Sequence, residues 1–132
     1  MAKIFLLVYF LFIGATAAAN DLAGVWELVS GEYIDGEGEL LDYEALELQS
    51  LKMISNSHFS FTSMKGNEFW ASGTGTYEIV NGKYIETLQY NSFDEAPGTT
   101  FTFDTKVEDE YWYNSRWEGD VRVEYEVWRR LE

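Results

Sequence analysis

Two charged residues, Glu86 and Arg116, fall on strand faces that are otherwise apolar. A carboxylate enclosed by apolar side chains has a raised pKa, so Glu86 is a candidate general acid or base. The guanidinium of Arg116 would instead pair with Glu86 or hold the carboxylate of a ligand. A third interpretation is structural, with Glu86, Arg116 and a tyrosine in a buried hydrogen-bond network that fixes strand register. The sequence leaves these roles open and assigns no catalytic residue; Glu86 is the candidate.

The strongest hairpin signal in the chain determines which face of its strand Glu86 occupies. Asn81-Gly82 lies between two alternating runs and predicts a type I′ turn. Opposite residues of an antiparallel pair share a face. The predicted pairs are Ile79 with Tyr84, Tyr77 with Glu86, Gly75 with Leu88, and Gly73 with Tyr90. This face is more apolar than the other, so we expect it to point inward.

Two later turns determine which face of its strand Arg116 occupies. A turn at Glu108-Asp109 pairs Thr105 with Trp112, Phe103 with Asn114, and Phe101 with Arg116. The turn at Glu118-Gly119 then adds Val121, Val123, Tyr125 and Val127 to the same face. These registers predict an aromatic inner wall with a few polar groups, which is typical of a small-molecule pocket. The residues predicted to bind a ligand are His58, Tyr84, Glu86, Tyr90, Phe101, Phe103, Trp112, Asn114, Arg116 and Tyr125.

The strand from His58 to Met64 has two possible registers. An even loop at Lys65 to Asn67 turns His58, Ser60, Thr62 and Met64 inward, whereas three loop residues turn Phe59 and Phe61 inward. His58 is the single histidine, and the chain has no cysteine and no Gly-x-Ser-x-Gly motif, which argues against a His-rich zinc site, a thiolate nucleophile and a nucleophilic triad. A haem needs one histidine, and the acidic segment Asp35 to Glu39 offers oxygen ligands for calcium, but without EF-hand spacing. We therefore predict no metal and no cofactor.

The elements that position these residues are short strands joined by short turns. Eight of them are predicted, at about Val25–Tyr33, Gln49–Ile54, His58–Met64, Glu68–Val80, Lys83–Tyr90, Thr99–Val107, Glu110–Trp117 and Val121–Arg130. Such a series predicts an all-β, eight-stranded antiparallel up-and-down barrel. Leu41, Ala45 and Leu48 have helical spacing, so residues 40–48 are predicted to form a short helix or lid.

The N-terminus has the pattern of an export signal. Lys3 precedes the apolar run Ile4 to Ile13, and Ala17-Ala18-Ala19 offers a cleavage site. We predict a signal peptide over residues 1–19, a single barrel domain over 20–132, a periplasmic or secreted location, and no membrane anchor after cleavage. The formal net charge of −14 argues against nucleic acid as a partner. Oligomeric state is not encoded in any recognisable pattern.

Gly24-Val25-Trp26 opens the first strand, and Arg129-Arg130 closes the last. A terminal arginine across the Trp26 indole would close one barrel end through a cation–π contact. These two motifs resemble those of the calycin superfamily, which includes the lipocalins. The mature chain is also similar to lipocalin-like secreted bacterial proteins of a domain-of-unknown-function family, in the segments Leu51-Lys52-Met53-Ile54, Gly73-Thr74-Gly75-Thr76-Tyr77, Asn81 to Thr87 and Glu126-Val127-Trp128. The resemblance implies the barrel and export, and it implies no activity.

Three functions follow from these predictions. The first is binding of a small, largely apolar or amphipathic ligand with a polar or acidic head. The second is a metal-free isomerase or cyclase in which Glu86 transfers protons beside His58 or Tyr84. The third is a structural or interaction domain with a filled core, which meets a partner through residues 40–48 or through Trp70 and Trp117.

Overall fold

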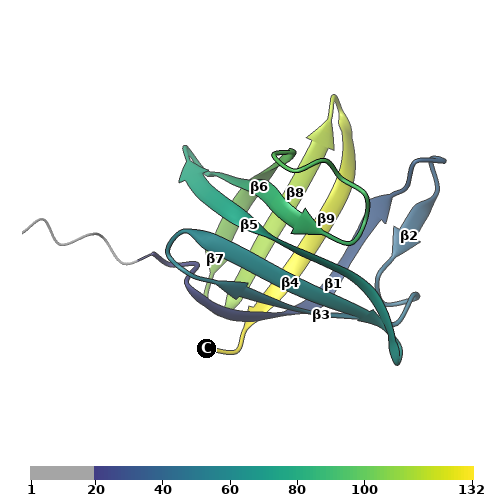
Figure 1. The fold of residues 1–132 in the computed structure, drawn as a ribbon, viewed down its shortest axis with the longest axis horizontal. Coiled ribbons are helices and arrows are strands. Elements are labelled where there is room, and N and C mark those ends of the chain that lie inside the picture. Colours follow the sequence, from purple (N-terminus) through teal and green to yellow (C-terminus); the bar gives the residue numbers. More distant parts are fainter. Residues whose placement is uncertain (1–19) are drawn as a thin grey trace, which may run out of the picture.

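The computed structural model describes residues 20–132, so the predicted signal peptide lies outside the described residues. Within them the protein is all-β, and no helix is long and apolar enough to cross a membrane. The strands are β1 (Gly24–Ile34), β2 (Leu40–Asp42), β3 (Leu48–Ile54), β4 (His58–Lys65), β5 (Glu68–Val80), β6 (Lys83–Asn91), β7 (Thr100–Glu108), β8 (Tyr111–Glu118) and β9 (Val121–Arg130) (Figure 1).

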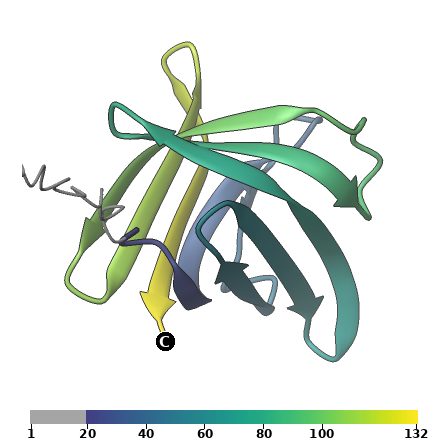
Figure 2. The ribbon, with the colours of Figure 1, turned by 60° about the vertical axis from the view of Figure 1, so that its left-hand side comes forward.

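The eight long strands form a closed antiparallel barrel, as the sequence predicted. Neighbours along the chain pair from β3 to β9, and β1 pairs with both β3 and β9 to close the wall. The beginning of β1 and the end of β9 therefore lie side by side at one end of the barrel (Figure 2). Closure removes free sheet edges along most of the wall, and the described residues hold this fold without disulfides.

The end of the barrel beside the chain's C-terminus is filled with side chains. Trp26 is fully buried there, and its indole Nε1 donates a hydrogen bond of 2.9 Å to the Leu22 carbonyl. The guanidinium carbon of Arg130 lies 4.2 Å from the Trp26 ring centroid, which confirms the predicted cation–π contact. Leu22 and Trp112 join the same buried cluster, so the residues just before β1 seal this end.

Residues 40–48 were predicted to form a short helix or lid, and the helix alternative is wrong. Residues 40–42 form β2, which pairs with the end of β1, and residues 43–47 form turns. The Asp42 carboxylate accepts hydrogen bonds from the backbone N–H groups of Glu44 and Ala45, and Glu47 has a positive φ of 54°. Five residues between two strands are too few for a stable helix, because nucleating the first turn is unfavourable.

Candidate functional site

The barrel encloses a cavity of about 380 Å³ toward the end opposite Trp26. Its wall is rich in aromatic rings, and its buried charged groups come from β3, β6, β8 and β9. The loop after β6 covers part of its mouth, because the Phe93 ring stacks on Phe61 with centroids 6.2 Å apart. The lining residues are Leu28, Tyr33, Tyr43, Leu48, Ser50, Lys52, Phe61, Ser63, Trp70, Ala71, Glu86, Leu88, Phe93, Glu95, Phe101, Phe103, Arg116, Glu124, Glu126 and Trp128.

A buried ion pair forms the floor of this cavity. Lys52 is 3% exposed and Glu86 is 5% exposed, and the Lys52 Nζ donates to Glu86 Oε1 over 2.9 Å. The Tyr84 hydroxyl donates to the same oxygen over 2.9 Å. Burial alone lowers the pKa of Lys52, but the carboxylates of Glu86 and Glu126 outweigh it and raise that pKa above its usual value. Lys52 therefore stays an ammonium and is a poor nucleophile.

Aromatic rings surround the Lys52 ammonium. Its Nζ lies between 4.8 and 6.0 Å from five ring centroids, those of Phe59, Phe61, Tyr84, Trp112 and Trp128. Trp128 is the nearest, at 4.8 Å. Cation–π attraction thus replaces part of the hydration that the ammonium loses on burial.

A second ion pair lies nearer the mouth. Arg116 Nε donates to Glu124 Oε2 over 2.9 Å, and Arg116 Nη1 lies 3.6 Å from Glu118. The guanidinium carbon is 5.4 Å from the Phe101 ring centroid. Burial raises the pKa of Glu124, and the adjacent guanidinium opposes that shift. Arg116 is therefore already engaged by two carboxylates of its own chain.

Glu126 is a third buried carboxyl group, and it has no ion-pair or hydrogen-bond partner among residues 20–132. It is 8% exposed and lines the cavity between the two ion pairs. Burial raises the pKa of Glu126 to about 8, helped by the charges of Glu124 and Glu86 and opposed by Lys52 and Arg116. At neutral pH Glu126 is therefore mainly a neutral carboxylic acid.

Tyr43 closes the wall beside this group. Its ring packs over Gly31 of β1, where an added Cβ would lie 2.8 Å from the Tyr43 Cδ2. Burial and the charges of Glu124 and Glu126 raise the pKa of Tyr43, so its phenol remains protonated. A side chain at position 31 would collide first with the Tyr125 backbone carbonyl oxygen, 2.3 Å from the added Cβ, and then with the Tyr43 ring, so glycine is required there.

Most of the predicted site residues do point into the barrel. Tyr84, Glu86, Phe101, Phe103 and Arg116 lie at or beside the cavity, whereas Trp112 and Asn114 are fully buried in the core behind it. The β7–β8 pairing differs from the prediction by two residues, because the turn is at positions 109–110 and Thr105 faces Asn114. A shift of two keeps the same residues on the inner face. The predicted face is therefore correct although the register is not.

Three predicted site residues do not point into the barrel, and they are Tyr90, Tyr125 and His58. Tyr90 is 76% exposed, because a bulge between Thr74 and Gly75 pairs Tyr90 with Thr74 instead of Gly73. Tyr125 lies on the outer face, since a bulge next to Arg116 pairs Arg116 with Glu124, and Tyr125 instead stacks under Arg122. One extra residue in a strand reverses which side chains point inward beyond it.

His58 is exposed at the start of β4, where its Nδ1 lies 2.7 Å from the Ser57 hydroxyl. The turn after β4 has two residues, which by itself would have turned His58 inward. A bulge beside Ser63 in the β4–β5 ladder reverses which residues of β4 point inward, so Phe59 and Phe61 face the interior. The placement of His58 in the binding site is therefore wrong.

Pairing of Glu86 with Arg116, one of the alternatives left open by the sequence, is also wrong, since Lys52 is the partner of Glu86. Sequence reasoning missed Lys52, Glu124 and Glu126. Along β3, Leu51 and Met53 are 44% and 56% exposed while Lys52 is buried, so the polar side of this strand faces inward. The sequence signal available for Lys52 was its position two residues after Ser50, which places both side chains on the less apolar face of the strand.

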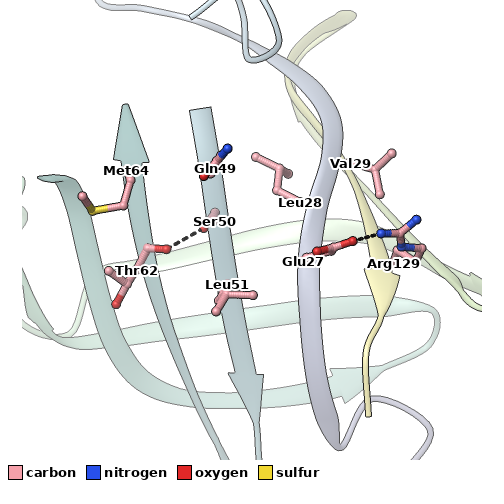
Figure 3. Close-up of a pocket in the computed structure, with 9 residues that line it drawn as sticks. All are labelled: Glu27, Leu28, Val29, Gln49, Ser50, Leu51, Thr62, Met64 and Arg129. Carbon is pink, nitrogen blue, oxygen red and sulfur yellow. Dashed lines mark hydrogen bonds and ion pairs between the residues drawn. The ribbon is translucent and has the colours of Figure 1, made fainter. Parts of the chain in front are cut away.

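The backbone pairing between β1 and β3 covers only part of the two strands. Their ladder runs from Gly24 opposite Ile54 to Glu27 opposite Leu51 and ends where a bulge bends β1 toward β9. A surface groove of about 660 Å³ lies there (Figure 3). Leu28 and Ser50 line both this groove and the interior cavity.

Fold and site together define a closed antiparallel barrel of eight strands around a ligand-sized cavity with a charged floor. No protein-family model matches the chain, and neither a curated protein nor a solved structure matches it. The resemblance to lipocalin-like secreted proteins stays a prediction from the sequence.

Proposed function

We propose that the protein binds a small, largely apolar or aromatic molecule with a polar head inside the barrel. The observation that carries this proposal is the cavity of about 380 Å³, lined by aromatic rings above buried polar groups. Ligand sites are usually concave, mostly apolar and supplied with a few oriented polar groups. A cavity of this volume disfavours the filled-core alternative.

The geometry does not favour Glu86 as an acid or base. Its Oε1 accepts hydrogen bonds from both Lys52 and Tyr84, so the carboxylate is held by the protein itself. A proton-transfer group needs access to the substrate at hydrogen-bond distance. The isomerase or cyclase alternative therefore lacks its central residue.

Export belongs to the same proposal. It is supported by the apolar run Ile4 to Ile13 followed by Ala17-Ala18-Ala19. Mass spectrometry of the protein expressed at full length should give a chain that begins at Asn20 and is recovered outside the cytoplasm. A cytoplasmic chain that retains Met1 or Ala2 would refute export and leave the binding proposal intact.

A neutral, polarity-sensitive naphthalene dye, prodan, tests the binding proposal. We expect a saturable blue shift of its emission, because entry into the cavity removes the dye from water. Ala71→Phe, at the cavity wall, should weaken dye binding at least about tenfold by filling the space.

Ser72→Phe is the matched control, because Ser72 is the next residue of β5 and shares the outer face with Thr62. Fluorescence titrations of the three proteins decide the outcome. A dye that shows no saturable binding, or binds the two phenylalanine variants equally, would overturn the proposed function.

A further inference from the structure

We propose that the polar head of the ligand is an organic ammonium, which pairs with Glu126 inside the cavity. This inference rests on the proposed binding function and names the chemical class of ligand. Of the polar or acidic head expected from the sequence, it sets the acidic alternative aside, because Arg116 already contacts Glu124 and Glu118.

The charges of the cavity are the first argument. Three interior carboxyl groups, Glu86, Glu124 and Glu126, line it together with two cationic side chains, Lys52 and Arg116. Lys52 lies 2.9 Å from Glu86 and Arg116 lies 2.9 Å from Glu124. Glu126 is therefore left without a cationic partner among these side chains. A buried carboxylate needs a cation or hydrogen-bond donors to offset its desolvation. An ammonium head supplies both.

The position of Glu126 is the second argument. Within residues 20–132, the fully enclosed polar side-chain atoms without a hydrogen-bond partner are Asn114 Nδ2 and Trp128 Nε1. The carboxylate oxygens of Glu126 are not among them although they too lack a partner, so they reach the open space of the cavity. Glu126 itself is only 8% exposed. It is therefore both unpaired and accessible to a ligand.

The aromatic wall is the third argument. The protein already places its own cations against rings, with Lys52 Nζ 4.8 Å from Trp128 and the Arg116 guanidinium 5.4 Å from Phe101. Both rings also line the cavity. An ammonium that reached Glu126 would meet the same kind of electron-rich surface, whereas a carboxylate would be repelled by it.

Proton balance follows from the state of Glu126. The charged groups around it are Lys52 on β3, Glu86 on β6, Arg116 on β8 and Glu124 on β9, and the titratable phenols of Tyr43 and Tyr84 also face it. Burial and the two carboxylates outweigh the two cations and raise the pKa of Glu126, so it is mainly protonated at neutral pH. An alkylammonium has a pKa near that of lysine, so it enters as a cation and the Glu126 proton leaves to solvent. Affinity should therefore rise about tenfold per pH unit below about pH 8 and level off above it.

A matched ligand series tests the inference. The probes are 4-phenylbutylamine, 4-phenylbutan-1-ol and 4-phenylbutanoate, which share one tail and differ in the head, each titrated by calorimetry and by displacement of prodan. We expect the amine to bind at least about tenfold more tightly than the alcohol at pH 8, with the carboxylate weakest. Calorimetry in buffers of different ionisation enthalpy should show release of about one proton per amine bound at neutral pH.

Glu126→Gln should reduce the ratio of amine to alcohol affinity about tenfold and abolish proton release. Glu78→Gln, at an exposed position of β5, is the matched control and should leave the ratio unchanged. If prodan binds but the amine has no advantage over the alcohol, the ammonium inference is overturned and the binding function stands. If prodan and all three probes fail to bind, both are overturned.

Discussion

Replacing Lys52 by methionine is expected to lower the free energy of unfolding by about 3–5 kcal/mol. The variant keeps a long apolar stem but removes the cation that faces the buried Glu86 carboxylate at 2.9 Å. Glu86 is then left in a low-dielectric environment with the Tyr84 hydroxyl as its remaining hydrogen-bond partner. Urea unfolding followed by tryptophan fluorescence measures the loss.

Lys83→Met is the matched control, because Lys83 forms an ion pair with Asp104 in which both side chains are about half exposed. Exposed pairs contribute about 0–1 kcal/mol, so this variant should be nearly neutral. Adding Glu86→Gln to Lys52→Met should restore at least half of the lost stability, since the uncompensated charge is removed. Equal losses for the two lysine variants would contradict a desolvated Lys52–Glu86 pair.

The fold was predictable because its signals are local. Asn81-Gly82 set the β5–β6 register next to the turn, where Ile79 faces Tyr84 and Tyr77 faces Glu86. Gly24-Val25-Trp26 and the terminal arginines identified the sealed end, where Arg130 does cover Trp26. Turn geometry and strand alternation act over a few residues, so they can be read from a single sequence.

The inner face of a strand could not be followed beyond a bulge. Val123 is the extra residue where β8 and β9 change register, and beyond it Glu124, Glu126 and Trp128 take the inner positions that alternation gave to Tyr125 and Val127. No turn-forming residue marks a bulge of this kind, since both strands continue on either side of it. The misplaced Tyr90 has the same cause.

The burial of Lys52 could not be predicted from the sequence, for an energetic reason. Alternation assigns the apolar Leu51 and Met53 to the interior, yet these are exposed and the lysine is buried. The inversion is stable because the carboxylate of Glu86, 34 positions along the chain, meets the ammonium inside the barrel. A long-range pair of this kind has no local signature, and burying either partner alone would be unfavourable.

The stability of the protein is expected to fall as the pH rises from about 5 to about 8, through Glu126. Its pKa is about 8 in the folded protein and 4.5 in the unfolded chain, so the folded state binds the extra proton between these values. The favourable contribution is fully present below the unfolded pKa and is lost as the pH approaches the folded pKa, with a slope of about 1.4 kcal/mol per pH unit. The raised pKa of Glu124 acts in the same direction.

Glu126→Gln isolates this effect, because an amide of the same shape does not titrate. The stabilities of the two proteins should diverge by about 4 kcal/mol between about pH 5 and pH 8, with the variant more stable at the higher pH. Repulsion among the many surface carboxylates also changes over this range, but equally in both proteins, so the difference between them reports the buried group. Parallel stability curves from urea unfolding at several pH values would mean that Glu126 is solvated in the folded state. A Glu126 whose pKa is not raised would release no proton when an amine binds, so the same experiment also bears on the proton release expected for the ammonium ligand.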